Sequence, residues 1–125
     1  MGLTRYQIRI KLNKLYNDKA KYNKDLSDYK TSLTYANKIV SSLKNCKNHL
    51  NSSLDNLKKS FKINNKTADD GKIKEVINSI DTILNNLEKK VIPNINSSIT
   101  NINESLRTVN YNITYWNNEL KKAEE

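Results

Sequence analysis

Apolar residues recur at alternating intervals of three and four along the first half of the chain. If Leu12 is position a of a seven-residue repeat, the a and d positions carry Ile8, Leu12, Leu15, Tyr22, Leu26, Tyr29, Leu33, Ala36, Val40, Leu43, Leu50, Leu54, Leu57 and Phe61. Only Lys19 and Lys47 interrupt this series. Such a repeat predicts a helix whose apolar seam packs against another helix in a left-handed supercoil. We therefore expect a helix over residues 4–63.

The second half of the chain resumes this spacing. Its apolar positions are Ile73, Ile77, Ile80, Leu84, Leu87, Val91, Ile95, Ile99, Ile102, Leu106, Val109, Ile113, Trp116 and Leu120. The stretch from Val91 to Ile102 has the eleven-residue spacing of a stutter, which locally unwinds a coiled coil. Pro93 lies inside it and lacks a backbone donor. We expect one helix over residues 72–122, kinked near Pro93, in preference to a break followed by a third helix from Asn94.

Residues 64–71, Asn-Asn-Lys-Thr-Ala-Asp-Asp-Gly, form the one cluster of helix-breaking residues. Thr67 followed by Asp70 is a candidate cap for the second helix, and Asp69 and Asp70 are alternative caps. A short turn between two helices of nearly equal length makes them antiparallel neighbours. The predicted fold is all-α: a long antiparallel two-helix hairpin, coiled-coil-like, forming a single domain over residues 1–125.

The apolar stripe is wider than one seam. Val76 and Ile83 flank the seam in the second helix, and Tyr16 and Ile39 flank it in the first. Because two helices cannot cover all of these side chains, we expect further helices, from a second copy or another chain, to complete a bundle. The residues predicted to bind that partner are Leu33, Val40, Leu43, Leu54, Leu57, Val76 and Ile83.

Positive charge is concentrated in the first half of the chain. The net charge is +9, and residues 1–63 hold 14 basic against 4 acidic side chains. Such asymmetry indicates an acidic partner, which could be nucleic acid, an anionic lipid or a protein. The basic residues of the first helix support an alternative function, a basic coiled coil that binds nucleic acid or an anionic surface: Arg5, Arg9, Lys11, Lys14, Lys19, Lys21 and Lys24. They lie all around the helix rather than along one strip, which makes nucleic acid the less favoured partner.

Composition limits both localisation and chemistry. Residues Met1–Leu12 contain no apolar core of a signal peptide, and no stretch approaches the roughly 18–20 apolar residues of a membrane span. The only histidine, His49, lies one helical turn from the only cysteine, Cys46, and a lone Cys–His pair is a weak nucleophile signature. Metal-ligand spacing and a glycine-rich phosphate loop are both missing. We expect no enzymatic activity, no cofactor and no bound metal.

Aromatic residues near the C-terminus fall into two groups. Trp116 occupies a seam position, whereas Tyr111 and Tyr115 occupy positions f and c on the outer face. Glu119 follows Tyr115 by four residues, so the two side chains share a face of the helix. The resulting Tyr-x-x-x-Glu string is the one short motif of the sequence.

A chain of this size with one long helical hairpin and a late Tyr-x-x-x-Glu string resembles the small type VII secretion proteins of Gram-positive bacteria. The Trp-x-Gly turn of the WXG100 proteins is missing, and the helices are longer, so the chain looks more like the YwqH-like proteins associated with LXG toxins. The resemblance implies a targeting factor or chaperone that binds the helical N-terminal domain of such a toxin, and a second small helical protein or a homodimer is compatible with it. Tyr115 and Glu119 would belong to the export signal. The protein would be cytoplasmic before export and then secreted with its partner.

Overall fold

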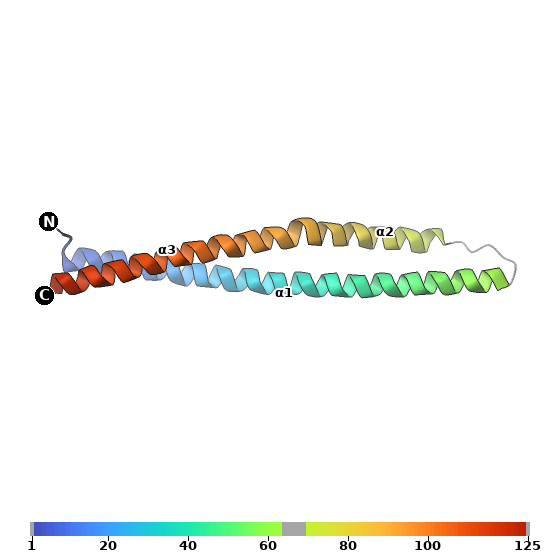
Figure 1. The fold of residues 1–125 in the computed structure, drawn as a ribbon, viewed down its shortest axis with the longest axis horizontal. Coiled ribbons are helices and arrows are strands. Elements are labelled where there is room, and N and C mark those ends of the chain that lie inside the picture. The colour runs from blue at the N-terminus through green and yellow to red at the C-terminus, as the bar shows by residue number, and fades with distance from the viewer. Residues whose placement is uncertain (1, 64–69, 125) are drawn as a thin grey trace. The chain divides into compact units, whose positions relative to one another are not determined.

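The computed structural model describes residues 2–63 and 70–124, and it is helical almost throughout (Figure 1). The elements are α1 (Arg5–Ile63), α2 (Gly71–Asn86), the π-helical segment η1 (Leu87–Val91) and α3 (Ile92–Glu124). The all-α prediction is confirmed, and the expected ranges 4–63 and 72–122 agree with the observed helices to within two residues. None of the described helices is long and apolar enough to cross a membrane.

A capping box begins α1. The Gln7 backbone N–H donates to the Thr4 hydroxyl at 3.2 Å, and the Thr4 backbone N–H donates to the Gln7 side-chain oxygen at 2.9 Å. Two backbone donors that the helix itself leaves without partners are satisfied in this way. The Thr-x-x-Gln spacing of residues 4–7 therefore fixes where α1 starts.

The start of α2 differs from expectation. Asp70 precedes the helix at the cap position, but its side chain makes no capping hydrogen bond. Its carboxylate instead accepts from the ammonium groups of Lys74 at 2.9 Å and Lys58 at 3.5 Å, so Asp70 as a side-chain cap is wrong. The alternative caps Thr67 and Asp69, like most of the predicted turn, lie outside the described residues.

Helical structure continues without interruption from Gly71 to Glu124, so the alternative of a break before a third helix from Asn94 is wrong. The spacing changes at η1, where the Ile92 backbone N–H donates to the Leu87 carbonyl five residues earlier. A π-turn inserts one extra residue into an α-helix. Pro93 follows immediately, in the first turn of α3, where a missing N–H is best tolerated. A π-turn therefore precedes Pro93, and the kink expected near Pro93 stays a prediction.

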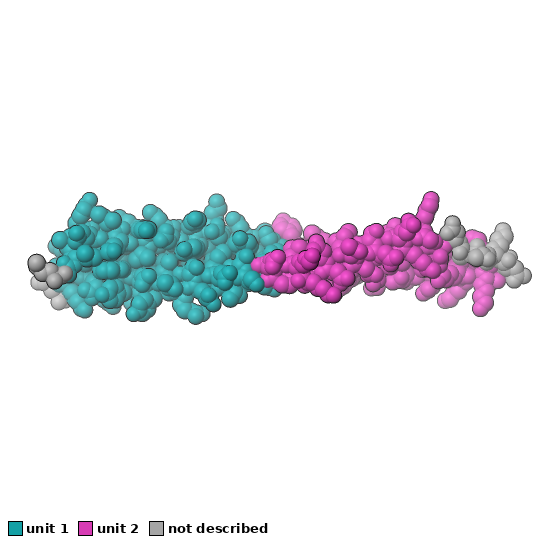
Figure 2. Space-filling view, turned by 90° about the horizontal axis from the view of Figure 1, so that it is seen from above, with its two compact units in different colours: residues 1–32, 95–125 teal, residues 33–94 magenta. Residues whose placement is uncertain are grey.

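The described contacts divide the chain into two compact units (Figure 2). Unit 1 comprises Met1–Ser32 and Ile95–Glu125, and unit 2 comprises Leu33–Asn94. The core of unit 1 joins Ile8 and Leu12 of α1 to Val109 and Ile113 of α3. Half-buried apolar side chains pack around it: Leu15, Tyr22, Trp116 and Leu120. In unit 2 the buried side chains are Ala36 and Leu54 of α1 and Ile77, Ile80 and Leu84 of α2.

The predicted seam agrees closely with burial. Every a and d side chain is buried or half-buried in both halves of the chain, with Tyr29 as the exception at 38% exposure. A phenol hydroxyl gains from hydration, which accounts for a tyrosine at the seam margin. The interrupting Lys47 is half-buried, and its ammonium forms an ion pair with Asp81. The seam thus accommodates this lysine by an ion pair at its edge.

Ion pairs cross unit 2 on one side of the seam. Lys44 of α1 binds Glu88 of η1 at 3.1 Å, and both residues occupy e positions. Along unit 2 the partners are Lys44 with Glu88, Lys47 with Asp81, and Lys58 with Asp70. Residues with higher numbers in α1 therefore pair with residues with lower numbers in the segment from Asp70 to Glu88.

Two isoleucines of α2 provide a matched test of this seam. Ile80 is 6% exposed and Ile83 is 48% exposed. We expect Ile80→Ala to lower the free energy of unfolding by roughly 2–5 kcal/mol, because it leaves a cavity. Ile83→Ala should change it by no more than about 0.5 kcal/mol. Urea unfolding followed by circular dichroism measures both variants, and equal losses would contradict the assigned seam.

Asp70 provides a pH-dependent test. Its hydrogen bond with Lys74, assisted by Lys58, lowers the pKa of the carboxyl group from the usual 3.8. A lowered folded-state pKa contributes stability above the unfolded pKa, and that stability is lost as the pH falls through the lowered value. We expect Asp70→Asn to lower the melting temperature slightly at pH 7, and this difference from the parent should disappear as the pH falls through the lowered pKa of Asp70. Asp55→Asn, at an exposed carboxylate, is the control, and an Asp70→Asn effect that persists in strong acid would refute the ion-pair explanation.

Candidate partner interface

One flank of unit 2 carries exposed apolar side chains and, along α1 and α2, no charge. In each helix the e and g positions lie on opposite sides of the a/d seam. Since the e positions of α1 and η1 meet at the Lys44–Glu88 pair, the g positions of both stretches share the other side. We call the following g residues the uncharged flank: Ile39, Cys46, Ser53, Ser60, Val76 and Ile83.

Three members of the uncharged flank are apolar and about half exposed. The exposed fractions are 49% for Ile39 and 48% for both Val76 and Ile83. Single exposed apolar residues are ordinary on protein surfaces, but several on one flank mark a surface for another protein. The surrounding small polar side chains would allow a helix to approach closely.

A shallow hollow borders this flank where α2 passes into η1. It has a volume of about 430 Å³ and is lined by Thr82, Ile83, Asn85, Asn86, Lys89 and Lys90. Both lysines are exposed, and within the described part of the chain neither forms an ion pair. The hollow therefore combines an apolar side chain, amide groups and two ammonium groups. Heptad spacing does not predict this hollow, which lies where α2 passes into the π-helical segment η1.

The predicted partner-binding residues separate into two sets. Leu54 is buried by its own chain, and the other four seam residues are half-buried: Leu33, Val40, Leu43 and Leu57. These five side chains hold the seam of unit 2 together. Val76 and Ile83, by contrast, belong to the uncharged flank, so they are the two that a partner can reach without opening the seam.

The late aromatic motif lies in unit 1. Trp116 is half-buried at the seam, with the Lys11 ammonium 5.3 Å from the centre of its ring. Tyr115 is 48% exposed and contacts Trp116 edge to face, with ring centres 4.9 Å apart. Lysine over an indole ring is a favourable cation–π arrangement. Tyr115 thus presents an exposed ring that is held in place by its neighbour.

Glu119 departs from the expected outer position. With Ile113 at position a, Glu119 occupies position g beside the seam, and its side chain is half-buried. Its carboxylate accepts a hydrogen bond from the Lys122 ammonium at 3.1 Å. Together with Gly2, Leu3 and Trp116 it borders a hollow of about 270 Å³. The two residues share a face of α3, but only Tyr115 is exposed, whereas Glu119 is half-buried.

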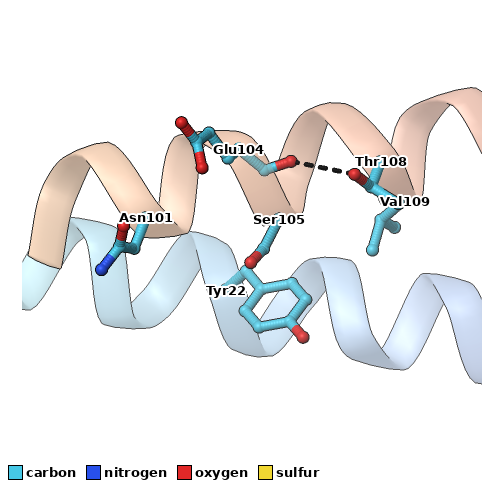
Figure 3. A pocket seen from close by; sticks show the side chains of 6 residues that line it. All are labelled: Tyr22, Asn101, Glu104, Ser105, Thr108 and Val109. Carbon is cyan, nitrogen blue, oxygen red and sulfur yellow. Dashed lines mark hydrogen bonds between the residues drawn. The ribbon is translucent and has the colours of Figure 1, made fainter.

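A second hollow of unit 1, of about 450 Å³, lies where Tyr22 of α1 meets α3. Figure 3 shows the Tyr22 ring beneath Ser105, whereas Glu104 points away from α1. The Thr108 hydroxyl donates to the Glu104 carbonyl at 3.2 Å, so it is already paired within its helix. The lining residues supply no nucleophile with a neighbouring base, and the hollow indicates no catalytic chemistry.

Cys46 and His49 are both exposed side chains on the outside of α1. Among residues 2–63 and 70–124, no group of three His, Cys, Asp or Glu side chains is placed to hold a metal ion. Comparison of the chain with family models, curated proteins and solved structures found no match.

Proposed function

We propose that this chain is a non-enzymatic interaction protein of type VII secretion that binds the helical N-terminal domain of an LXG-type toxin and targets it for export. The observation that carries the proposal is the uncharged flank, where Ile39, Val76 and Ile83 stay exposed although the seam is packed. A helical protein with a complete seam and a second apolar flank is suited to receiving further helices. The resemblance to small type VII secretion proteins supplies the class of partner.

In this proposal the chain is an antiparallel hairpin that adds its helices to those of the toxin domain. The order of the ion pairs in unit 2 supports that arrangement, because rising numbers in α1 meet falling numbers in the second stretch. Association of the chain with the toxin domain would bury apolar side chains that are exposed in each protein alone. Burial of about 25 cal/mol per Å² of apolar surface is the main driving force of such association.

The export signal is proposed at Tyr115 and Glu119. The exposed Tyr115 ring offers contact area, and Glu119 offers a carboxylate to a basic group of the secretion machinery. Binding a receptor would require Glu119 to exchange Lys122 for that group. Lys122 is well exposed, and a surface ion pair of this kind contributes less than about 1 kcal/mol, so the exchange costs little.

The alternative function, binding of nucleic acid or an anionic surface, depends on the positive charge of α1. Three lysines of unit 2, Lys44, Lys47 and Lys58, already hold carboxylates of their own chain. Their charge is therefore partly neutralised on the e side of unit 2. This internal pairing lowers the positive charge that unit 2 offers to a phosphate backbone, whereas the seven basic residues named for this alternative lie in unit 1.

We expect the double variant Tyr115→Ala, Glu119→Ala to accumulate normally and to co-purify with the toxin domain, while secretion of both proteins is lost. The reason is that neither side chain belongs to the seam core, so stability should change by about 0.5 kcal/mol per site. The measurement is the amount of both proteins in cells and in the medium of a type VII-competent bacterium.

The matched control is Tyr111→Ala, Glu104→Ala, which removes the same residue types from exposed positions of α3. Secretion of this control should equal that of the parent. Unchanged secretion of the Tyr115, Glu119 variant would show that the string is a coincidence of helical composition. Loss of co-purification would place these residues in the partner interface instead.

A further inference from the structure

The charged residues around the uncharged flank are mostly basic. On the neighbouring c and f positions and at the g position of η1, unit 2 carries one acidic residue, Glu75, and five lysines: Lys38, Lys59, Lys72, Lys89 and Lys90. The acidic side chains Asp81 and Glu88 lie on the other side of the seam, where each binds a lysine of α1. The internal ion pairs thus leave an apolar strip with a basic border.

Lys89 and Lys90 stand out within that border. Both belong to η1 and border the hollow of about 430 Å³ beside Ile83. The preceding residue, Glu88, is directed to the opposite side by its pair with Lys44. Two adjacent ammonium groups beside an exposed isoleucine recognise an apolar side chain that has a carboxylate close to it. The side chains of an amphipathic helix with acidic flanking positions provide that combination.

We infer that the uncharged flank docks one amphipathic helix of the partner, whose apolar side chains lie on Ile83, Val76 and Ile39 and whose acidic side chains pair with Lys89 and Lys90. This inference rests on the proposed function and specifies which face receives the toxin domain and which kind of helix fits it. A second copy of the chain fits less well. In a two-fold symmetric pair, the same basic border would face itself, and like charges across an interface oppose association.

The test measures binding of the purified chain to the helical N-terminal domain of an LXG-type toxin, by calorimetry at two salt concentrations. We expect Ile83→Asp, and separately the double variant Lys89→Glu, Lys90→Glu, to raise Kd at least about tenfold. The lysine variant should also show a weaker dependence of Kd on salt than the parent. Circular dichroism should show unchanged helicity, since all three side chains are exposed.

Matched controls come from unit 1. Ile10→Asp makes the same change at an isoleucine that is 50% exposed on position f of α1. The double variant Lys14→Glu, Lys21→Glu makes the same change in net charge at exposed lysines. Both controls should bind the toxin domain with the parent Kd.

The outcomes separate the two proposals. If the parent does not bind the toxin domain, the proposed function fails. If the parent binds and all the unit 2 variants bind equally well, the function stands and the docking face is wrong. A parent that sediments as a dimer, and becomes monomeric on Ile83→Asp, would assign the flank to a second copy. Binding to phosphatidylserine vesicles that both lysine variants weaken equally would overturn the helix-specific site in favour of a general anionic surface.

Discussion

The structure depends on burial of one apolar seam that repeats every seven residues. Apolar residues make up only 36% of the chain, and the seam uses a large share of them. Burial of the a and d side chains also determines which way the side chains at the other heptad positions face. In unit 2 the e positions then meet and form ion pairs, as Lys44 and Glu88 do, and the g positions form the opposite flank. The exposure of Val76 and Ile83 is therefore a geometric consequence of the seam and not a packing defect.

The π-turn reconciles this seam with the irregular spacing of the second helical stretch. Val91, Ile95 and Ile99 follow one another at intervals of four, which would carry the apolar stripe away from the seam in a regular heptad. The π-turn ends at Val91 and changes the phase of the helix before Ile95 and Ile99, and all three side chains are half-buried. π-turns of this kind are frequent at functional sites. Here the turn also places Lys89 and Lys90 beside the hollow at Ile83.

Sequence periodicity predicted the helices and the seam well because a long amphipathic pattern depends on many residues at once. It did not predict features that depend on a single residue or a single hydrogen bond. Aspartate is a common helix-capping residue, but the carboxylate of Asp70 binds two nearby lysines instead of the backbone N–H groups of α2. Glu119 was placed on the outer face because it pairs with Tyr115 by spacing, although its own heptad position lies beside the seam. Four leucines and one valine are apolar enough to be predicted as interface residues, but their own chain covers them in the seam. Val76 and Ile83 differ from these five only in their heptad position, because they occupy g rather than a or d.

If a helical partner covers the second apolar flank, as we propose, the chain should be more stable with that partner than alone. Thermal melting by circular dichroism, combined with sedimentation of the chain alone and with the toxin domain, tests this most directly. We expect a highly helical protein that alone is either marginally stable or self-associated, and whose melting temperature rises when the toxin domain is added. A rigid monomer that melts above about 90 °C alone, with no change on addition of the toxin domain, would contradict it.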